Sequence, residues 1–457
     1  LILIVVGSLL LGGREQVEAA AEEDAGHSRS REKEYAMQSD SLVRDPSLAP
    51  GGHKKIDWAA EHSPVLNRVR DEYLKDGTFE GLGVGVALPI EAKTAYLTVV
   101  LAEAGADVSV ASPGPFFVQD DVAAALAERG VTVYASSEAD PLEADRPLER
   151  VLDRVAEDRD AVLIDDRAGL TRLAHTTRRG LLPRIRGASE ETTSGVAKFK
   201  AMERENILEF PTVAANDARC KYLFDNRYGT GQSAITAIMQ NTNLMMGGKR
   251  LVMLGYGWCG KGIARYAAGL GARGTVCEVD PVRGLEAYAD GFDVLPALEA
   301  CEQGEIFITA TGSTDVLTTQ HFERMREGAI LANAGGVDVE IDVDGLKEAA
   351  SGSRVVRRNV EEFALADGRR VYLIGRGMVV NLTAGDGHPI EIMDLTFAIQ
   401  ALCAHHLARD GHALENRVHL LPKEIDDEVA RIKLDAVGMG VDTLTPEQEE
   451  FLAGWRE

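Results

Sequence analysis

The glycine-rich stretch at residues 255–260 has the spacing of a turn that binds a dinucleotide. Its sequence is Gly-Tyr-Gly-Trp-Cys-Gly, and it lies between an apolar run and a segment with helical periodicity at residues 261–271. In such a turn Gly255 allows a sharp bend, Gly257 lets the backbone approach a pyrophosphate, and Gly260 lets the helix pack closely on the strand. The free N–H groups of the helix N-terminus then face the phosphates. The spacing therefore predicts a nucleotide-binding turn, and the alternative is a glycine-rich turn that binds nothing.

An acidic residue at the expected distance extends this pattern. A short strand-like run at residues 274–277 ends on Glu278. This position lies about 20 residues after the glycines, where a carboxylate can accept hydrogen bonds from both hydroxyls of a ribose. A carboxylate there would also repel a 2′-phosphate. We therefore predict that the cofactor is NAD and not NADP.

Lysine and carboxylate side chains form a second group with chemical potential. Lys221 and Asp225 are four residues apart, so on a helix they would share one face. Asp166 ends an apolar run, and Glu191 belongs to a polar stretch at residues 187–195. Side chains of these types can hold sugar hydroxyls and can accept or donate protons. The simpler interpretations are a solvated ion pair for Lys221 and Asp225, a loop N-cap for Asp166, and an exposed helix start for Glu191.

Strands and helices alternate along the first half of the chain. Alternation of this kind predicts a parallel, doubly wound sheet with helices on both faces. Ligands of such sheets bind beyond the carboxyl ends of the strands, and both Glu91 and Asp166 follow predicted strands. Helices are expected at residues 56–70, 92–104, 120–129 and 148–157, and strands at residues 83–88, 106–111, 131–134 and 161–164.

A second alternating block contains the glycine-rich turn and is followed by helical segments. Further strands are expected at residues 250–254, 306–312 and 329–333, and helices at residues 389–408 and 425–434. The two blocks predict an α/β fold with two domains. A doubly wound parallel-sheet substrate domain, residues 54–227 and 387–457, would carry an inserted Rossmann NAD-binding domain, residues 228–386. Hinges near Tyr228 and Ala384 would let the domains close over a substrate.

The composition is that of an ordinary globular protein. Of the 457 residues, 45% are hydrophobic and 27% are charged, and the net charge is −24. The chain has no basic stripe, which argues against binding to nucleic acid. The five cysteines form no C-x-x-C pair. This argues against a disulfide framework or a zinc site, so we predict no metal and a reducing, cytoplasmic location.

Residues 1–50 differ from the rest of the chain. The apolar run at residues 1–11 has no basic flank, and it is too short to cross a bilayer. Residues 14–50 are rich in Glu, Arg, Ser and Ala and poor in large apolar side chains, which is typical of disorder. We predict that residues 1–50 are disordered or non-native, with Met37 a candidate for the true start, and that no membrane is bound.

Four longer motifs lie in and around the two blocks. They are residues 187–195 (Gly-Ala-Ser-Glu-Glu-Thr-Thr-Ser-Gly), 224–233 (Phe-Asp-Asn-Arg-Tyr-Gly-Thr-Gly-Gln-Ser), 338–342 (Asp-Val-Glu-Ile-Asp) and 387–389 (Gly-His-Pro). Together they resemble the adenosylhomocysteinase family, and the resemblance covers residues 54–455. Residues 91–95 (Glu-Ala-Lys-Thr-Ala) and 228–233 are similar to the archaeal and thermophilic-bacterial branch.

The resemblance implies an NAD-dependent hydrolase. In this family, tightly bound NAD⁺ oxidises the ribose 3′-hydroxyl of S-adenosyl-L-homocysteine, which acidifies the 4′-proton. Homocysteine then leaves from C5′, water adds, and the 3′-ketone is reduced again, so the cofactor is not consumed. The reaction is reversible and yields adenosine and homocysteine, a step of the methyl cycle in one-carbon metabolism. The resemblance also implies a homotetramer.

The resemblance also implies roles for individual residues by motif match. Lys221 would be the base at the 3′-hydroxyl, with Asp225 beside it. Asp166 would be the base at C4′, and Glu191 the carboxylate that holds the ribose hydroxyls. The expected substrate-binding residues are Glu91, Lys93, Thr192 and His388. The expected cofactor-binding residues are Thr192, Thr193, Ser194, Asn226, Gly255, Gly257, Trp258, Gly260, Glu278, Asn333 and Asn381.

At several positions the chain departs from the family pattern. Pro89 stands where the family has a histidine that acts as acid or base at C5′, and Gly336 replaces a histidine near the 3′-hydroxyl. Neither residue can transfer protons, and losing one general acid or base typically costs a factor of about 10²–10⁴ in rate. The other departures are Phe117 and Val118 in a polar loop of the family, Gly169 in place of an aspartate of its Asp-Asp-Gly-Gly-Asp run, and Met378 in place of an arginine.

These departures leave three functions open. The first is the ordinary family reaction, with water or Lys93 acting in place of the missing histidines. The second is a paralogous NAD enzyme that oxidises or eliminates at the ribose of another nucleoside, because the changes gather on the C5′ side. The third is a non-catalytic regulator that binds NAD and a nucleoside. The survival of Lys221 and its neighbouring carboxylates argues against this last function.

Overall fold

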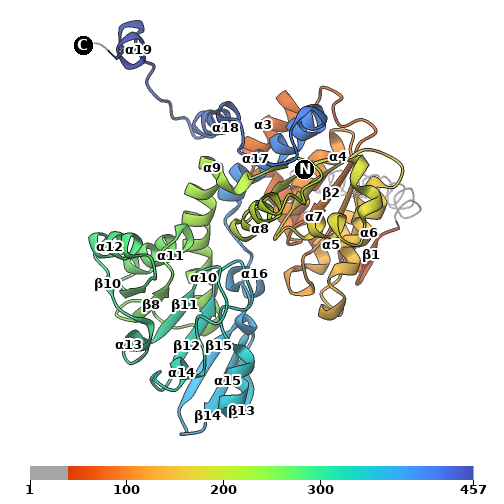
Figure 1. Cartoon of the computed structure of the whole chain (residues 1–457). Coiled ribbons are helices and arrows are strands. Elements are labelled where there is room, and N and C mark those ends of the chain that lie inside the picture. The colour runs from red at the N-terminus through yellow and green to blue at the C-terminus, as the bar shows by residue number, and fades with distance from the viewer. Residues whose placement is uncertain (1–39, 456–457) are drawn as a thin grey trace, which may run out of the picture.

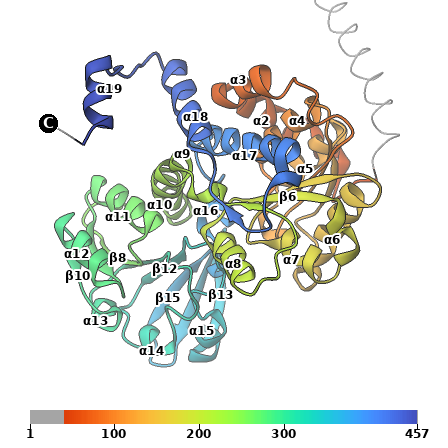
Figure 2. The ribbon, with the colours of Figure 1, turned by 45° about the horizontal axis from the view of Figure 1, so that its top comes forward.

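The computed structural model describes residues 40–455, and Figures 1 and 2 show that these residues form two lobes. Each lobe is built on one eight-stranded sheet with helices on its faces. The apolar run at residues 1–11 and the candidate start at Met37 lie outside the described residues.

The first sheet is parallel throughout and has the strand order β1-β4-β3-β2-β5-β6-β7-β16. Its central strands are apolar and buried over their whole length, as expected of strands covered on both faces. The strands are β1 (Leu42–Val43), β2 (Gly83–Ala87), β3 (Asp107–Ala111), β4 (Thr132–Ala135), β5 (Ala161–Asp165), β6 (Ile185–Glu190), β7 (Thr212–Val213) and β16 (Val418–His419).

Helices cover both faces of this sheet. They include α17, a long apolar helix that returns after the second lobe and packs on β5 and β6. Asp394 on α17 accepts hydrogen bonds from the N–H groups of Val65 and Leu66, which are free at the start of α3. The helices of this lobe are α2 (Ala49–Glu61), α3 (Pro64–Tyr73), α4 (Ala92–Glu103), α5 (Asp120–Glu128), α6 (Asp145–Ala156), α7 (Gly169–His175), α8 (Thr193–Arg204), α9 (Arg219–Lys221), α17 (Ile390–Asp410) and α18 (Lys423–Ala436). A last helix, α19 (Pro446–Ala453), lies away from both lobes.

The second sheet has the order β10-β9-β8-β11-β12-β15-β14-β13 and is parallel except that β14 runs antiparallel to both of its neighbours. Its strands are β8 (Arg250–Leu254), β9 (Arg273–Cys277), β10 (Asp293–Val294), β11 (Ile306–Thr309), β12 (Ala329–Asn333), β13 (Ala350–Arg357), β14 (Val360–Leu365) and β15 (Arg370–Ile374). Its helices are α10 (Thr230–Thr242), α11 (Trp258–Gly269), α12 (Pro281–Ala289), α13 (Ala297–Cys301), α14 (Thr319–Phe322), α15 (Val343–Ala349) and α16 (Val380–Thr383).

The predicted fold class is confirmed: the protein is an α/β chain with two doubly wound sheets. Two local expectations were wrong. Residues 40–50 were expected to be disordered, but they form β1, which pairs with β4, and the start of α2. The single helix expected at residues 56–70 is two helices, because Pro64 cannot donate a backbone hydrogen bond and begins a new helix instead.

No helix within residues 40–455 is both long enough and apolar enough to cross a membrane.

Candidate active site

A cavity of about 1200 Å³ lies where the carboxyl ends of the two sheets face each other. Its walls come from both lobes and from the segments that join them. The loops after β2, β5 and β6 contribute the polar residues of the first lobe, and the loops after β8, β9 and β11 contribute those of the second. This is the position at which doubly wound sheets bind ligands.

The glycine turn after β8 has the geometry that a dinucleotide requires. Gly255 has a φ of 96°, and a Cβ on it would lie 2.7 Å from the carbonyl oxygen of Ala310. A Cβ on Gly260 would lie 2.0 Å from the carbonyl oxygen of Gly255, so helix α11 packs there without room for a side chain. A Cβ on Gly257, by contrast, would lie 4.0 Å from its nearest neighbour, a side-chain nitrogen of Arg283. This backbone is therefore open to the cavity, as an approaching pyrophosphate needs.

Glu278 stands at the end of β9, beside this turn. Its Oε2 accepts a hydrogen bond from the N–H of Tyr256 at 2.7 Å, and its Oε1 accepts from Val279 and Asp280 at 2.8 and 3.1 Å. These three backbone donors fix the carboxylate at the edge of the cavity. The arrangement fits the ribose of an NAD adenosine half.

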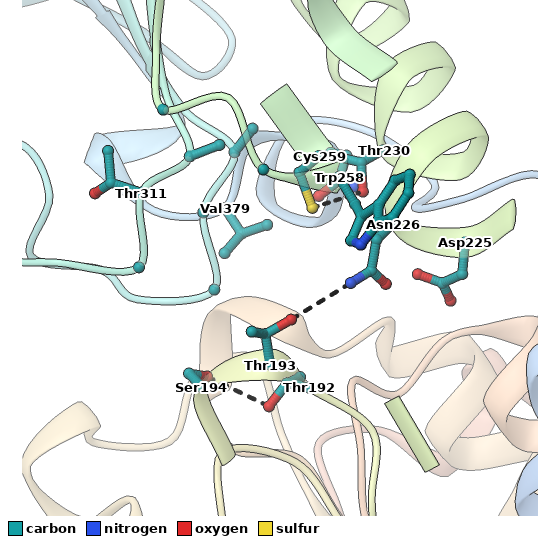
Figure 3. A pocket seen from close by; sticks show the side chains of 18 of the residues that line it. Thr192, Thr193, Ser194, Asp225, Asn226, Thr230, Trp258, Cys259, Thr311 and Val379 are labelled. Atoms are coloured by element: carbon teal, nitrogen blue, oxygen red, sulfur yellow. Dashed lines mark hydrogen bonds between the residues drawn. The ribbon is translucent and has the colours of Figure 1, made fainter. Parts of the chain in front are cut away.

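Another part of the cavity wall carries one unsatisfied polar group and several hydroxyl groups. Asn381 donates a hydrogen bond to the Oγ of Ser233, while its buried Oδ1 has no partner within residues 40–455. Figure 3 shows Thr192, Thr193 and Ser194 on one side of the cavity, facing Asn226 and Trp258 on the other. An orphaned buried acceptor and a row of hydroxyls can both bind a polar ligand. We conclude that the residues present fit NAD.

Lys221 lies at the centre of the cavity, at the junction of the two lobes. The chain from Tyr222 to Gly229 is π-helical, so both the i+4 and the i+5 residue reach the lysine. Its Nζ lies 3.1 Å from Oδ1 of Asp225, 2.8 Å from Oδ1 of Asn226, and 3.4 Å from Oε1 of Glu191. Nearly the whole lysine side chain is buried, which is rare unless the charge is paired.

The ammonium group of Lys221 and the carboxylates of Asp225 and Glu191 stabilise one another's charged forms. Burial lowers the pKa of Lys221, but the attraction of Asp225 and Glu191 outweighs it and raises the pKa above its ordinary value. Burial acts to raise the pKa of Asp225, but Lys221 and His388 lower it by more than burial raises it, so the pKa lies below its ordinary value. The second oxygen of Asp225 accepts a hydrogen bond from Thr396 at 2.9 Å. Lys221 and Asp225 are thus held as an ion pair.

The cost of burying the charge of Glu191 is offset less completely than that of Asp225. Burial raises its pKa to about 7, although Lys221 and a 2.6 Å hydrogen bond from Gln400 on α17 act in the opposite direction. A carboxylate with a pKa near neutrality can hold hydroxyl groups in either protonation state.

Three further carboxylates are buried where β5 and β6 end. Oδ1 and Oδ2 of Asp165 accept from the N–H groups of Leu170 and Thr171, and Glu190 accepts from the N–H groups of Arg167, Ala168 and Thr192. Asp166 follows Asp165 and lines the cavity, and its buried Oδ1 has no partner within the described residues. Burial raises the pKa of Asp166, against the opposing charges of Arg167 and Lys221. Such a group is suited to accept a proton.

Glu91, Lys93 and His388 line a third side of the cavity. Glu91 caps helix α4 by accepting from the N–H groups of Lys93 and Thr94. The Nζ of Lys93 lies 2.6 Å from Oε2 of Glu91 and 2.8 Å from the carbonyl oxygen of Asp386. His388 lies between Asp225 and Thr230, with ring nitrogens 3.3 and 3.2 Å from their oxygens.

Comparisons with known proteins bear on this site. Two family models match: S-adenosyl-L-homocysteine hydrolase over residues 40–180, and the S-adenosyl-L-homocysteine hydrolase NAD binding domain over residues 226–387. The adenosylhomocysteinase of Pyrococcus abyssi is 49% identical over 418 residues, which are 92% of this chain and 98% of that protein. The S-inosyl-L-homocysteine hydrolase of Methanopyrus kandleri is 48% identical over 429 residues, 93% of this chain and 99% of that protein.

The chain belongs to the S-adenosyl-L-homocysteine hydrolase family. It is an NAD-dependent hydrolase, and several of its relatives are archaeal. The predicted family, cofactor and class of enzyme are therefore confirmed.

The structure of this hydrolase places most of the predicted site residues on the cavity wall. Two do not line it. Gly260 packs against the turn, as expected, and Asn333 is buried behind the wall, where it bonds to Thr309, Gly335 and Val337. Those on the wall are Glu91, Lys93, Asp166, Glu191, Thr192, Thr193, Ser194, Lys221, Asp225, Asn226, Gly255, Gly257, Trp258, Glu278, Asn381 and His388.

Several residues of the site were not foreseen from the sequence. Thr396 and Gln400 come from the apolar helix α17, where only their polar character among apolar neighbours could have marked them. Glu190 was not named as a site residue, and it is fully buried. The π-helical turn after Lys221 has no sequence signal that would distinguish it from a regular helix.

Proposed function

We propose that this chain reversibly hydrolyses an S-nucleosyl-L-homocysteine to a nucleoside and homocysteine through oxidation at ribose C3′. The observation that carries this proposal is the buried Lys221, which three oxygen-bearing side chains hold between the cofactor turn and the carboxylates of the first lobe. Bound NAD⁺ would take a hydride from C3′ and later return it.

The protein's own residues would hold the ribose and move its protons. Lys221, held by Asp225 and Asn226, would contact the 3′-oxygen and act as its base. It would first release one proton of its ammonium group to water, and the neutral amine would then take the proton of the 3′-hydroxyl. Glu191 would accept hydrogen bonds from the ribose hydroxyls. Asp166, with its unpaired Oδ1, would take the proton from C4′ once C3′ is a ketone.

The base of the nucleoside is a purine in this proposal. The similar proteins bear both names, adenosylhomocysteinase and S-inosyl-L-homocysteine hydrolase, and their identities to this chain differ by little. Lys93 and Glu91, which line the cavity together, offer a hydrogen-bond donor and an acceptor, so they could contact either adenine or hypoxanthine.

At C5′ we propose that the chain is a divergent member of its family. Pro89 and Gly336 both line the cavity, and neither carries a group that titrates. Two proton transfers are needed at C5′, one to the leaving thiolate and one from the attacking water. A second water molecule or Lys93 would carry them out. We expect slower C5′ chemistry than in a relative with histidines at these positions, with oxidation at C3′ retained.

Domain motion and assembly complete the proposal. We place the domain limits at residues 227/228 and 386/387, with hinges near Tyr228 and Ala384. We also propose a homotetramer. Apolar side chains are exposed on α19, which lies away from both lobes, and on α12, for example Phe451, Leu452 and Leu285. Sedimentation of the full chain and of a chain that ends at residue 437 would test this assembly.

The proposed reaction is tested by supplying S-adenosyl-L-homocysteine and S-inosyl-L-homocysteine to NAD-loaded protein. Homocysteine is followed with a thiol reagent and the nucleoside by chromatography. The proposal expects equal amounts of homocysteine and nucleoside from at least one substrate, with no net change in NAD. Absence of both products from both substrates, with NAD demonstrably bound, would contradict it.

A further inference from the structure

Two residues with left-handed backbone follow Asp166 at the end of β5. Arg167 has a φ of 57° and Ala168 a φ of 58°. L-residues seldom adopt this conformation, and glycine would do so without strain. The strained pair is held by Glu190, which accepts hydrogen bonds from the N–H of Arg167 at 3.0 Å and of Ala168 at 2.9 Å. The turn therefore directs the Arg167 side chain at a cost that a glycine would avoid.

The guanidinium of Arg167 extends from the first lobe to the second. Its Nη1 donates to Oδ2 of Asp338 at 2.7 Å, and its Cζ lies 5.3 Å from the centre of the Phe117 ring. The side chain is 21% exposed. One arm of the guanidinium is thus fixed by a carboxylate, and one face of it is covered by an aromatic ring.

The remaining hydrogen-bonding groups of this pair are unused. A guanidinium has five N–H donors, yet within residues 40–455 the side chain of Arg167 donates only to Asp338. The other oxygen of that carboxylate, Oδ1, is buried and likewise has no partner among these residues. Because Arg167 lines the cavity, its remaining donors can reach a ligand there.

Arg167 is part of the wall of the cavity. Arg167 lines the cavity together with Pro89 and Gly336, and Asp338 follows two residues after Gly336. A Cβ on Gly336 would meet only the Oγ of Ser194, at 3.5 Å. Neither Pro89 nor Gly336 therefore fills the cavity with a long side chain, and space is left for a substituent of the ligand.

We propose that Arg167, positioned by Asp338, binds the amino-acid half of the substrate, with the guanidinium on its α-carboxylate. This proposal rests on the proposed function, because it assumes a substrate that carries homocysteine at C5′. A guanidinium matches a carboxylate with two parallel N–H donors. Its contacts with Asp338 and Phe117 hold it ready before the ligand arrives, which reduces the entropy lost on binding.

Two ligands separate this role from a purely structural one. S-adenosyl-L-homocysteine carries the carboxylate and the ammonium, whereas 5′-methylthioadenosine keeps the nucleoside and the thioether but has neither charge. If the protein prefers hypoxanthine, the corresponding inosine compounds are used. Dissociation constants of NAD-loaded protein for both ligands are measured by calorimetry. The variant is Arg167→Gly, which accommodates the left-handed backbone and removes only the side chain.

The proposal expects Arg167→Gly to weaken binding of the zwitterionic ligand by about 10- to 100-fold and of the neutral ligand by less than about 3-fold. Arg167→Lys should keep only part of the preference for the zwitterionic ligand, because an ammonium group lacks the two parallel N–H donors of a guanidinium. The matched control is Arg172→Ala on α7, whose guanidinium pairs with the exposed Asp145, and it should change neither constant.

Two results would overturn the proposal. If Arg167→Gly weakens the binding of both ligands equally, the arginine serves only to hold the lobes together. If it weakens neither, or if the wild type does not prefer the zwitterion, the amino acid is not recognised here. Reduction of bound NAD by free nucleoside, which has no amino-acid half, should persist in Arg167→Gly. Loss of that signal in the wild type would instead count against the proposed function.

Discussion

The two halves of the cavity are built in different ways. The part of the cofactor half that fits the pyrophosphate and the adenosine ribose is local: strand β8, helix α11 and strand β9 supply the turn and Glu278 within one short segment. The nucleoside half gathers charged side chains from β5, β6, the π-helical turn and α17, which are far apart in sequence. A binding site made of backbone groups requires residues without side chains at a few neighbouring positions. A group of charged side chains requires that distant segments of the chain fold together.

The halves also differ in electrostatics. Glu278 in the cofactor half is held by backbone donors alone. In the nucleoside half, burial raises the pKa of Asp165, Asp166, Glu190 and Glu191. Arg167 and Lys221 oppose this shift for Asp166, Lys221 opposes it for Glu191, and hydrogen bonds oppose it for Asp165 and Glu190, in each case only in part. The unligated protein therefore carries a folding cost in this half, which sugar hydroxyls and an amino acid would reduce on binding.

The largest effect is expected at the cofactor turn. Gly260→Ala would place a Cβ 2.0 Å from the carbonyl oxygen of Gly255, so the turn must open. We expect loss of bound NAD and of all turnover, together with a fall in stability of about 1–3 kcal/mol. NAD content after denaturation and a chemical unfolding curve measure both. Gly269→Ala, on the same helix with no atom within 4 Å, is the control. Normal NAD content in Gly260→Ala would show that the cofactor half does not depend on this close packing.

A somewhat smaller effect is expected at the centre of the nucleoside half. Lys221→Met keeps the length of the side chain and removes the ammonium group. The rate at which a nucleoside reduces bound NAD should fall by about 10²–10⁴-fold, with NAD content unchanged. Lys249→Met, at an ion pair with Glu305 outside the cavity, should leave the rate as it is. A rate within a factor of about three of wild type would remove Lys221 from proton transfer.

The next effect tests cofactor specificity. Glu278→Ala should weaken NAD binding by about 10- to 100-fold, because a carboxylate that accepts two ribose hydroxyls is lost. Discrimination against NADP should fall at the same time. Competition binding of the two dinucleotides measures both, and Glu286→Ala on α12, whose carboxylate pairs with Lys261, is the control. An unchanged preference for NAD in Glu278→Ala would place the specificity elsewhere.

The smallest effect is a pH dependence in the nucleoside half. The pKa of Glu191 is raised from its ordinary 4.5 to about 7 by burial. The folded protein therefore holds this proton where the unfolded chain has lost it, and stability falls as pH rises through this range. We expect NAD-free wild type to lose about 1–3 kcal/mol more than Glu191→Gln between about pH 5 and about pH 8. Parallel stability curves for the two proteins would show that Glu191 does not titrate in this range.

The glycine turn and Glu278 could be predicted from local sequence pattern, whereas the rest of the cofactor half and the nucleoside half could be named only through resemblance. Gly255, Gly257, Gly260 and Glu278 could be assigned because each meets a requirement of one short βαβ unit. Lys221 and the acidic residues could be named through resemblance, but their mutual geometry could not. The π-helical turn after Lys221 and the bonds from Thr396 and Gln400 depend on how α17 packs on the first sheet. The antiparallel strand β14 was also not foreseen, because no parallel-sheet pattern marks it.

The most direct test of the account follows the reduced-nicotinamide absorbance band and free thiol together. NAD-loaded protein is mixed first with adenosine or inosine and then with the corresponding nucleosyl-homocysteine. The account predicts rapid reduction of NAD by the nucleoside and slower release of homocysteine, because Lys221 and the cofactor turn are in place while Pro89 and Gly336 supply no proton. Homocysteine release without any transient reduction of NAD would contradict the account, since the thioether would then be broken without oxidation at C3′.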